Sequence, residues 1–165
     1  MSETEVGQVA CVGLGGNLGE RQANLDGAVA AIGATPGVSD IEVSDFFETE
    51  GEGGPPDQPL YLNGVLRCRT TLGAQDFLQR LLEIEREFGR DREQEVPNGP
   101  RPLDLDLLLL GDLCVDAPDL KLPHPRLEQR VFVLAPLAQL APDLILPACG
   151  LSVSERLAQL EAQGQ

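Results

Sequence analysis

The chain has 165 residues, of which 42% are hydrophobic, and its formal net charge is −15 at pH 7. This length suits one domain with a single core, and the apolar fraction argues against a disordered chain. Because a surface with so much negative charge repels nucleic acid and anionic membranes, we expect neither as a partner.

Targeting signals and cysteine spacing exclude further classes. No apolar stretch reaches the roughly 18 residues of a membrane helix. The acidic N-terminal segment MSETEVGQVA lacks the basic region and the long apolar run of a signal peptide. We therefore expect a cytoplasmic protein. A zinc site and a disulfide framework are not expected, because no two of the four cysteines form a C-x-x-C pair. We expect them to be small core residues: Cys11, Cys68, Cys114 and Cys149.

The first third of the chain predicts two strands separated by a helix. The apolar run Gly7–Gly15 ends in glycines and is typical of a central strand. Apolar residues then recur at the spacing of one helix face: Leu25, Ala28, Val29 and Ile32. Residues 38–49 alternate in polarity and predict a second strand. The Gly- and Pro-rich segment Glu50–Pro59 predicts a long loop.

The rest of the chain predicts two more strands and several helices. Leu60–Thr71 alternates like a third strand, and a second amphipathic helix follows it, with apolar positions at Phe77, Leu81, Ile84 and Phe88. A polar loop, Gly89–Pro102, leads into a fourth strand. Short helices are expected beyond Pro123, the last of them capped by a box formed by Ser152 and Glu155.

The predicted order of elements is β-α-β-β-α-β with a helical tail. This order matches the ferredoxin-like α/β sandwich, in which two helices cover one face of a four-stranded antiparallel sheet. We therefore expect an α+β fold whose second sheet face is open unless the helical tail and the two long loops cover it.

The fourth strand contains two carboxylates in an otherwise apolar run. Side chains alternate along a strand, so Asp104 and Asp106 share one face, roughly 7 Å apart, while the leucines between them face the core. A divalent cation relieves the repulsion between such carboxylates, and Mg²⁺ takes one or two of them together with phosphate oxygens and water. The alternative is a solvated sheet edge, or carboxylates bridged to arginine.

Positive charge gathers near this strand. Seven of the twelve basic residues lie within Arg86–Arg130. Arg101 stands between two prolines, three residues before Asp104, and His124 also lies between prolines. Guanidinium groups bind phosphate oxygens through paired hydrogen bonds. Carboxylates for metal beside arginines for phosphate indicate phosphoryl transfer. Each of these side chains, taken alone, is also compatible with a solvated loop residue.

Two other patterns bear on a ligand. Tyr61 and Asn63 share a face of the third strand and suit stacking and hydrogen bonding to a flat heterocycle, although both are also ordinary residues for an edge strand. The run GLGGNLG does not fit a dinucleotide fingerprint, because Leu18 occupies the position of the third glycine.

Four segments together resemble the 6-hydroxymethyl-7,8-dihydropterin pyrophosphokinase family of folate biosynthesis: GLGGNLGERQANL, DQPLYLNGV, PRPLDLDLLLLG and LPHPRLEQRVFVLAPLAQLAP. The resemblance spans about residues 8–147. Its most specific part is PR-x-x-D-x-D, followed 18 residues after its second acid by the histidine of PHP. The fold of this family is ferredoxin-like, in agreement with the order of elements above, and the resemblance implies that residues 1–165 form a single pyrophosphokinase domain.

The resemblance implies transfer of the β,γ-pyrophosphate of ATP to the hydroxymethyl oxygen of the pterin, with release of AMP. Asp104 and Asp106 are implied to hold two Mg²⁺ ions, and together with Arg90 and Arg101 they form the implied catalytic set. The residues implied to contact ATP are Arg90, Arg92, Arg101, His124 and Arg130. Those implied to hold the pterin are Thr49, Tyr61, Asn63 and Phe132.

The chain departs from the family pattern in the loop before Arg101. Asn98 stands where relatives often have an aromatic residue, and the loop is slightly longer and more acidic, with Asp91, Glu93 and Glu95. We expect these changes to affect loop closure and ATP affinity and not the class of reaction.

Two other functions are compatible with the same fold. One is a ferredoxin-like module that binds a nucleotide without turnover, which the intact pair of aspartates argues against. The other is a partner-binding subunit of a larger folate complex, but no surface pattern in the sequence indicates a protein partner.

Overall fold

The computed structural model describes residues 7–50, 57–91, 93, 95 and 100–164. Its sheet is antiparallel in the order β2-β4-β1-β5, and β3 also pairs with β4. The strands are β1 (Gln8–Gly16), β2 (Val38–Val43), β3 (Phe47–Thr49), β4 (Tyr61–Thr70) and β5 (Asp104–Leu110). The helices are α1 (Arg21–Gly33), α2 (Ala74–Glu87), α3 (Val131–Leu140) and α4 (Val153–Ala162), with a 3₁₀ turn, η2 (Leu127–Gln129).

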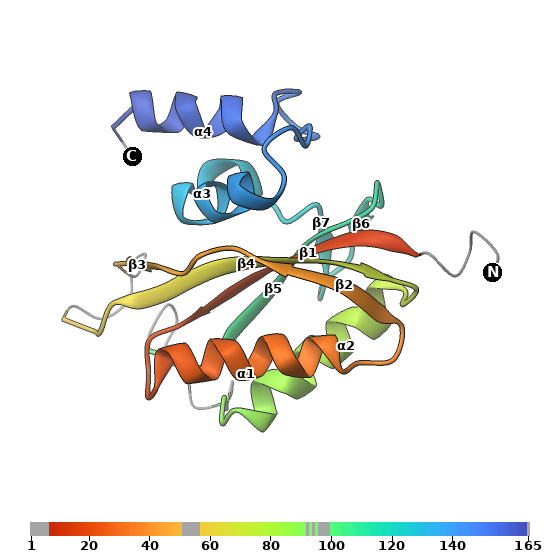
Figure 1. Ribbon diagram of the computed structural model, residues 1–165, viewed down its shortest axis with the longest axis vertical. Helices are drawn as coiled ribbons and strands as arrows, with labels where there is room; N and C mark the ends of the chain where they lie inside the picture. Colours follow the sequence, from red (N-terminus) through yellow and green to blue (C-terminus); the bar gives the residue numbers. More distant parts are fainter. Residues whose placement is uncertain (1–6, 51–56, 92, 94, 96–99, 165) are drawn as a thin grey trace.

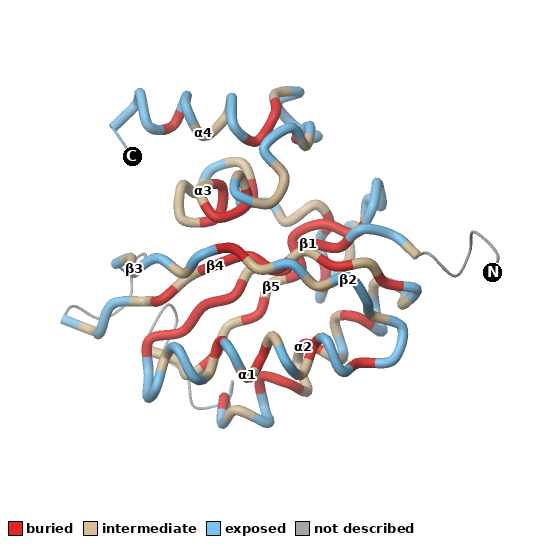
Figure 2. Tube along the Cα trace, in the orientation of Figure 1, coloured by how far each residue is buried: buried red, intermediate tan, exposed pale blue. Residues whose placement is uncertain are grey.

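Helices lie on both faces of the sheet (Figure 1). α1 and α2 cover one face, as the ferredoxin-like order predicts, and bury its main core through residues such as Leu25, Phe77 and Leu105. α3 packs on the other face and α4 packs on α3, around a second core that contains Val65, Leu134 and Leu160. The central strands are therefore buried along much of their length (Figure 2). The predicted fold is confirmed, and the helical tail covers part of the second face.

The segment expected to be one strand, residues 38–49, forms two. β2 ends at Val43 because Ser44 interrupts the ladder: its N–H donates to the Val65 carbonyl, while its hydroxyl accepts from the Val65 N–H, both at 2.9 Å. Phe46 then lies over Gly64, where a Cβ would fall 2.5 Å from its ring. Pairing with β4 resumes in β3, opposite Tyr61–Asn63.

Side chains alternate along the central strands, so that one face of the sheet packs against α1 and α2 and the other face carries polar groups. Leu14 of β1, Leu66 of β4 and Leu105 of β5 face α1 and α2. The intervening positions face the other side, where β1 contributes only glycines near its C-terminal end. Gly15 pairs with Asn63 on one side and with Asp104 on the other, and Gly13 pairs with Val65 and Asp106. This register places a row of polar side chains across the sheet with no β1 side chain between them.

A short hairpin that the sequence pattern does not predict follows β5. It consists of β6 (Val115–Asp116) and β7 (Lys121–Leu122), and it returns the chain to the sheet. The His124 N–H then donates to the Leu108 carbonyl at 2.9 Å, which anchors the histidine beside β5.

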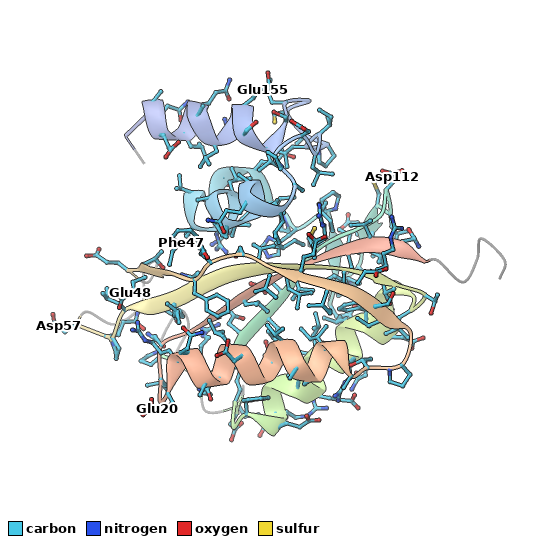
Figure 3. The ribbon with its side chains drawn as sticks, viewed as in Figure 1. Glu20, Phe47, Glu48, Asp57, Asp112 and Glu155 are labelled. Atoms are coloured by element: carbon cyan, nitrogen blue, oxygen red, sulfur yellow. The ribbon has the colours of Figure 1, made fainter. Side chains whose placement is uncertain are left out.

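Acidic side chains dominate the outer surface. Five of those labelled in Figure 3 extend from the ribbon and are exposed: Glu20, Glu48, Asp57, Asp112 and Glu155. Most acidic side chains of the described residues are exposed in this way, where water and counterions solvate them.

The predicted cap of α4 is present and gives a test of the second core. The Ser152 hydroxyl accepts from the Glu155 N–H at 3.1 Å, and the Glu155 carboxylate accepts from the Ser152 N–H at 2.9 Å. We expect Ser152→Ala to lower the free energy of unfolding by about 1 kcal/mol. Thermal denaturation checks this, with an expected loss of about 2–4 °C. An unchanged midpoint would contradict a stabilising role for the box.

Candidate active site

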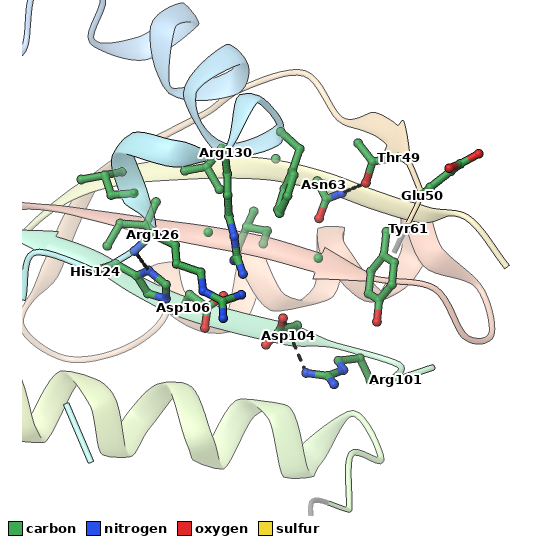
Figure 4. Close-up of a pocket in the computed structure, with 18 residues that line it drawn as sticks. Thr49, Glu50, Tyr61, Asn63, Arg101, Asp104, Asp106, His124, Arg126 and Arg130 are labelled. Carbon is green, nitrogen blue, oxygen red and sulfur yellow. Dashed lines mark hydrogen bonds and ion pairs between the residues drawn. The ribbon is translucent and has the colours of Figure 1, made fainter. Parts of the chain in front are cut away.

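A cavity opens on the α3 side of the sheet, between α3 and the ends of β4 and β5 (Figure 4). Its floor is formed by β1, one wall by β4 with β3, and the opposite wall by β5 with residues 124–133. Nearly every predicted site residue that the structure describes lines it: Thr49, Tyr61, Asn63, Arg101, Asp104, Asp106, His124, Arg130 and Phe132. Arg92 lies outside the described residues.

The glycines of β1 make this cavity possible. Gly13 and Gly15 both line it. A Cβ on Gly15 would fall 2.8 Å from Oδ1 of Asn63, closer than such atoms approach, so that a side chain there would displace the amide. The glycine-rich run thus leaves room above β1 for a ligand and for the side chains of β4.

The two aspartates of β5 lie on the cavity face, as predicted, while Leu103, Leu105 and Leu107 are buried on the other side. Burial, and then repulsion from Asp104, raises the pKa of Asp106 to about 7. The pair therefore concentrates more negative charge than its surroundings stabilise, which is the electrostatic condition for binding a cation.

The donor set fits a hard divalent cation that keeps other ligands. Among residues 7–50, 57–91, 93, 95 and 100–164, no group of three or more histidine, cysteine or acidic side chains is arranged to enclose a metal ion. Asp104 and Asp106 are a pair, and Mg²⁺ binds in just this way, through one or two carboxylates with substrate phosphates and water completing the shell.

Arg90 lies behind the aspartates instead of in the cavity. Its side chain is only 2% exposed. Nη1 donates to Glu85 at 2.8 Å and to Asp104 at 2.9 Å, and Nε and Nη2 bind both oxygens of Glu95 at 2.6 and 3.0 Å. The family resemblance implies contact with ATP. In this structure Arg90 binds three carboxylates, one of which is Asp104.

Glu85 is the residue of this network that the sequence reasoning missed. It lies on the buried face of α2 and accepts from the Leu105 N–H at 2.8 Å, between the two aspartates of β5. The sequence contained one signal for it: Glu85 is a charged residue next to the apolar positions of an amphipathic helix, where a buried carboxylate needs a partner. Glu85 thus joins α2 to the strand that bears the aspartates.

Arg101 approaches the aspartates from the cavity side. Its Nη1 lies 3.9 Å from Oδ2 of Asp104, and its side chain is 15% exposed (Figure 4). Both peptide groups of Arg101 are bonded to Asn17, whose Oδ1 accepts from the Arg101 N–H at 2.9 Å. The backbone of Arg101 is thereby fixed at the edge of the cavity, with its guanidinium beside Asp104.

The far wall supplies a hydrogen-bond donor and two more cations. Nδ1 of His124 accepts from the Arg126 N–H at 3.1 Å. Burial and the nearby Arg130 lower the pKa of His124. The imidazole is therefore neutral at pH 7, with its proton on Nε2, available for donation to a ligand. Arg126, part of the basic cluster but not of the predicted site, also lines the cavity.

The wall formed by β3 and β4 is polar and aromatic. The Asn63 amide donates to the Thr49 hydroxyl, and the Tyr61 ring stands beside them (Figure 4). Burial raises the pKa of Tyr61, against a smaller opposing effect of Arg101. Phe132 completes the set, with the Arg130 guanidinium 5.2 Å from its ring centroid. These groups suit a flat heterocycle with hydrogen-bonding edges.

A ferredoxin-like sheet with paired carboxylates, flanking arginines and an aromatic wall defines a class: enzymes that transfer phosphate groups from a nucleotide to a small acceptor. Residues 11–142 match the model of the family described as 7,8-dihydro-6-hydroxymethylpterin-pyrophosphokinase (HPPK). The chain belongs to this family, and the predicted family and enzyme class are confirmed.

Curated relatives agree. The chain is 42% identical over 153 residues to the 2-amino-4-hydroxy-6-hydroxymethyldihydropteridine pyrophosphokinase of Pseudomonas aeruginosa, covering 93% of this chain and 92% of that protein. It is 40% identical over 152 residues to the Synechocystis protein with the same name, covering 92% and 76%.

Longer proteins also contain this fold. A crystal structure of Plasmodium falciparum HPPK-DHPS has a TM-score of 0.71 at 12% identity, and the match covers 94% of this chain but only 46% of that chain. This likeness concerns the fold. Separately, none of the helices in the described part of the chain has the length and apolar character to cross a membrane.

The raised pKa of Asp106 gives a testable signature in metal-free protein. The folded state binds a proton more tightly than the unfolded state, whose ordinary value is 3.8, so Asp106 makes stability fall as pH rises from about 4 to 7. We expect Asp106→Asn to be more stable than the parent near pH 7 in EDTA, by a few degrees in thermal denaturation.

Metal provides the matching control. Added Mg²⁺ is expected to stabilise the parent protein at pH 7.5 and to leave Asp106→Asn unchanged, because the variant lacks one of the two carboxylates. An equal response of both proteins to Mg²⁺ would remove Asp106 from the metal site.

Proposed function

We propose that this chain transfers the β,γ-pyrophosphate of ATP to the hydroxymethyl oxygen of 6-hydroxymethyl-7,8-dihydropterin and releases AMP. The observation that supports it is that an aromatic, amide-bearing wall and a wall of carboxylates and arginines face each other across one cavity. Family membership supports the same reaction. A nucleotide-binding module without turnover would not need both walls.

Asp104 and Asp106 would hold Mg²⁺, in two ions with the nucleotide phosphates as further ligands. When bound, the metal supplies positive charge that stabilises the transferring group. Arg90 acts from behind by holding Asp104 in place. Its direct contact with ATP would require Glu95 to release Nε and Nη2.

Arg101 and Arg130, with His124 as a neutral donor, would bind the phosphate oxygens, and Arg126 extends this set at the cavity mouth. Arg92, in the loop outside the described residues, keeps its proposed place as an ATP contact. In a chain of net charge −15, this wall is a local site for anions. Guanidinium groups fixed before the reaction stabilise charge without reorganising during it.

Tyr61, Asn63, Thr49 and Phe132 would hold the pterin. The rings supply stacking surface, and the Asn63 amide and the main chain near Thr49 match the donors and acceptors of the heterocycle edge. This positions the hydroxymethyl oxygen toward the phosphate wall. The oxygen then attacks the β-phosphorus and gives up its proton to water, the bond between that phosphorus and the oxygen of the α-phosphate breaks, and AMP leaves. Positioning therefore supplies most of the catalysis.

We further propose that residues 1–165 act as one pyrophosphokinase domain and that the protein is cytoplasmic. Two cores that share a single sheet support the first statement. The composition of the N-terminal segment supports the second.

Product analysis tests the reaction directly. With ATP, Mg²⁺ and 6-hydroxymethyl-7,8-dihydropterin, at low and at molar KCl, we expect AMP to form only when the pterin is present. Formation of ADP would indicate a kinase acting on another acceptor, and ATP binding without any product would indicate a non-catalytic module.

Substitutions test the roles of individual residues. Asp104→Ala should remove nearly all turnover and leave a folded protein, because its side chain belongs to the cavity and not to the core. Arg101→Ala should slow turnover by roughly a hundredfold, the usual scale for losing one preorganised electrostatic contact. Steady-state kinetics with circular dichroism measures both, and near-parental rates would place either residue outside the machinery.

A further inference from the structure

One buried amide lies at the junction of the two loops that border the cavity. Asn17 follows β1 directly and is only 2% exposed. Its Nδ2 donates to Oε1 of Gln58 at 3.0 Å and to the Pro59 carbonyl at 2.9 Å, while its Oδ1 accepts from the Arg101 N–H at 2.9 Å. The amide nitrogen therefore binds one loop through two hydrogen bonds, and the amide oxygen binds the other loop.

The same residue also binds Arg101 through the main chain. The N–H groups of Asn17 and Leu18 approach the Arg101 carbonyl at 3.0 and 3.3 Å. Contact is so close that a Cβ on Gly16 would fall 2.5 Å from the Pro102 carbonyl oxygen. The turn after β1 thus holds the backbone of Arg101 on both sides.

The two segments joined by Asn17 belong to different halves of the site. Gln58 and Pro59 immediately precede Leu60 and β4, whose first residue is Tyr61 on the heterocycle wall. Arg101 lies three residues before Asp104, the first residue of β5, and its Nη1 lies 3.9 Å from Oδ2 of Asp104 on the phosphate wall. Beside the strand pairing through β1, one amide therefore joins the segments that lead into the two walls.

Neighbouring polar side chains reach these segments separately. Arg21 donates to the Leu60 carbonyl at 2.9 Å, on the heterocycle side. Asn24 donates to the Pro102 carbonyl at 3.3 Å, on the phosphate side. This difference supplies a matched control. Asn24 has the same amide group as Asn17 and lies nearby, but it donates to the Leu18 and Pro102 carbonyls, neither of which belongs to the heterocycle wall.

We propose that Asn17 is a positioning residue that couples binding of the two substrates. A ligand that orders one wall also orders the amide and so the other wall, and the second ligand then loses less conformational freedom on binding. Such coupling is reciprocal and typically changes affinity by about 5- to 150-fold. The inference rests on the proposed function, because it assigns the heterocycle and the nucleotide to the two walls.

Calorimetry with non-reacting ligands measures this coupling. The dissociation constant of 6-hydroxymethylpterin is determined with and without saturating Mg²⁺ and α,β-methylene-ATP, in the parent, Asn17→Ala, Gln58→Ala and Asn24→Ala. We expect the nucleotide analogue to tighten pterin binding at least about tenfold in the parent. The coupling ratio is the pterin dissociation constant without the nucleotide analogue divided by that with it. We expect this ratio to be below about three in Asn17→Ala, intermediate in Gln58→Ala, and equal to the parental value in Asn24→Ala.

Kinetics separates positioning from stability. Asn17→Ala should lower kcat about tenfold or more, since Arg101 no longer holds its place. Because the coupling is reciprocal, the KM for ATP at saturating pterin should rise by about the factor by which the coupling falls. A purely structural role would lower the midpoint of thermal denaturation and the yield of folded enzyme, but it would not change the ratio of the two dissociation constants. If Asn17→Ala does not fold, Gln58→Ala, which alters only a loop contact, decides the question.

The outcomes distinguish the two proposals. A parental coupling ratio in Asn17→Ala overturns the inference. If Asn17→Ala does not fold, a parental ratio in Gln58→Ala overturns it. A parent protein that forms AMP but shows no coupling also overturns it. A parent that forms no AMP overturns the proposed function, whatever the coupling. Loss of coupling in Asn17→Ala with the ratio preserved in Asn24→Ala supports the inference.

Discussion

Burial of Asp106, together with its repulsion from Asp104, is the constraint around which the site is built. Two carboxylates on one strand face, one of them with its pKa raised to about 7, destabilise the fold unless positive charge is near. Arg90 supplies that charge from inside the protein and Arg101 from the cavity side. The interior arginine in turn requires Glu85, which bonds the backbone between the two aspartates. α2, β5 and the loop before β5 are thus joined by one electrostatic network.

The same network separates rigid from adjustable parts of the site. Contacts of Arg90 with Glu85 and Asp104 lie within the packed layers, and burial strengthens such charge pairs. Its contact with Glu95 comes from the polar loop, and the Glu95 side chain is 16% exposed, against 1% for Glu85. The fold therefore presents carboxylates held by packed elements beside a loop whose Glu95 binds the same guanidinium.

Local patterns predicted the sheet, its main helices and the shared face of the two aspartates, because alternation and helical spacing are properties of neighbouring residues. These patterns did not predict contacts between segments that are distant in the sequence. Ser44 ends β2 through a bond to Val65, and Glu85 reaches Leu105 from another element. Arg90 looked like a loop cation, yet three carboxylates enclose it. Most site residues came from the family resemblance, since chemistry alone indicated only metal-dependent phosphoryl transfer.

The bare floor of the cavity limits how this site can change over evolution. Gly13 and Gly15 already contribute the least volume that any residue can, so no substitution in β1 can deepen the site. A shift to a larger heterocycle must then come from shortening side chains on β4 or residues 124–133. A smaller acceptor needs only one methyl group added at Gly13, where a Cβ would lie 3.7 Å from its nearest neighbour. Acceptor size is consequently easier to restrict than to extend in this scaffold.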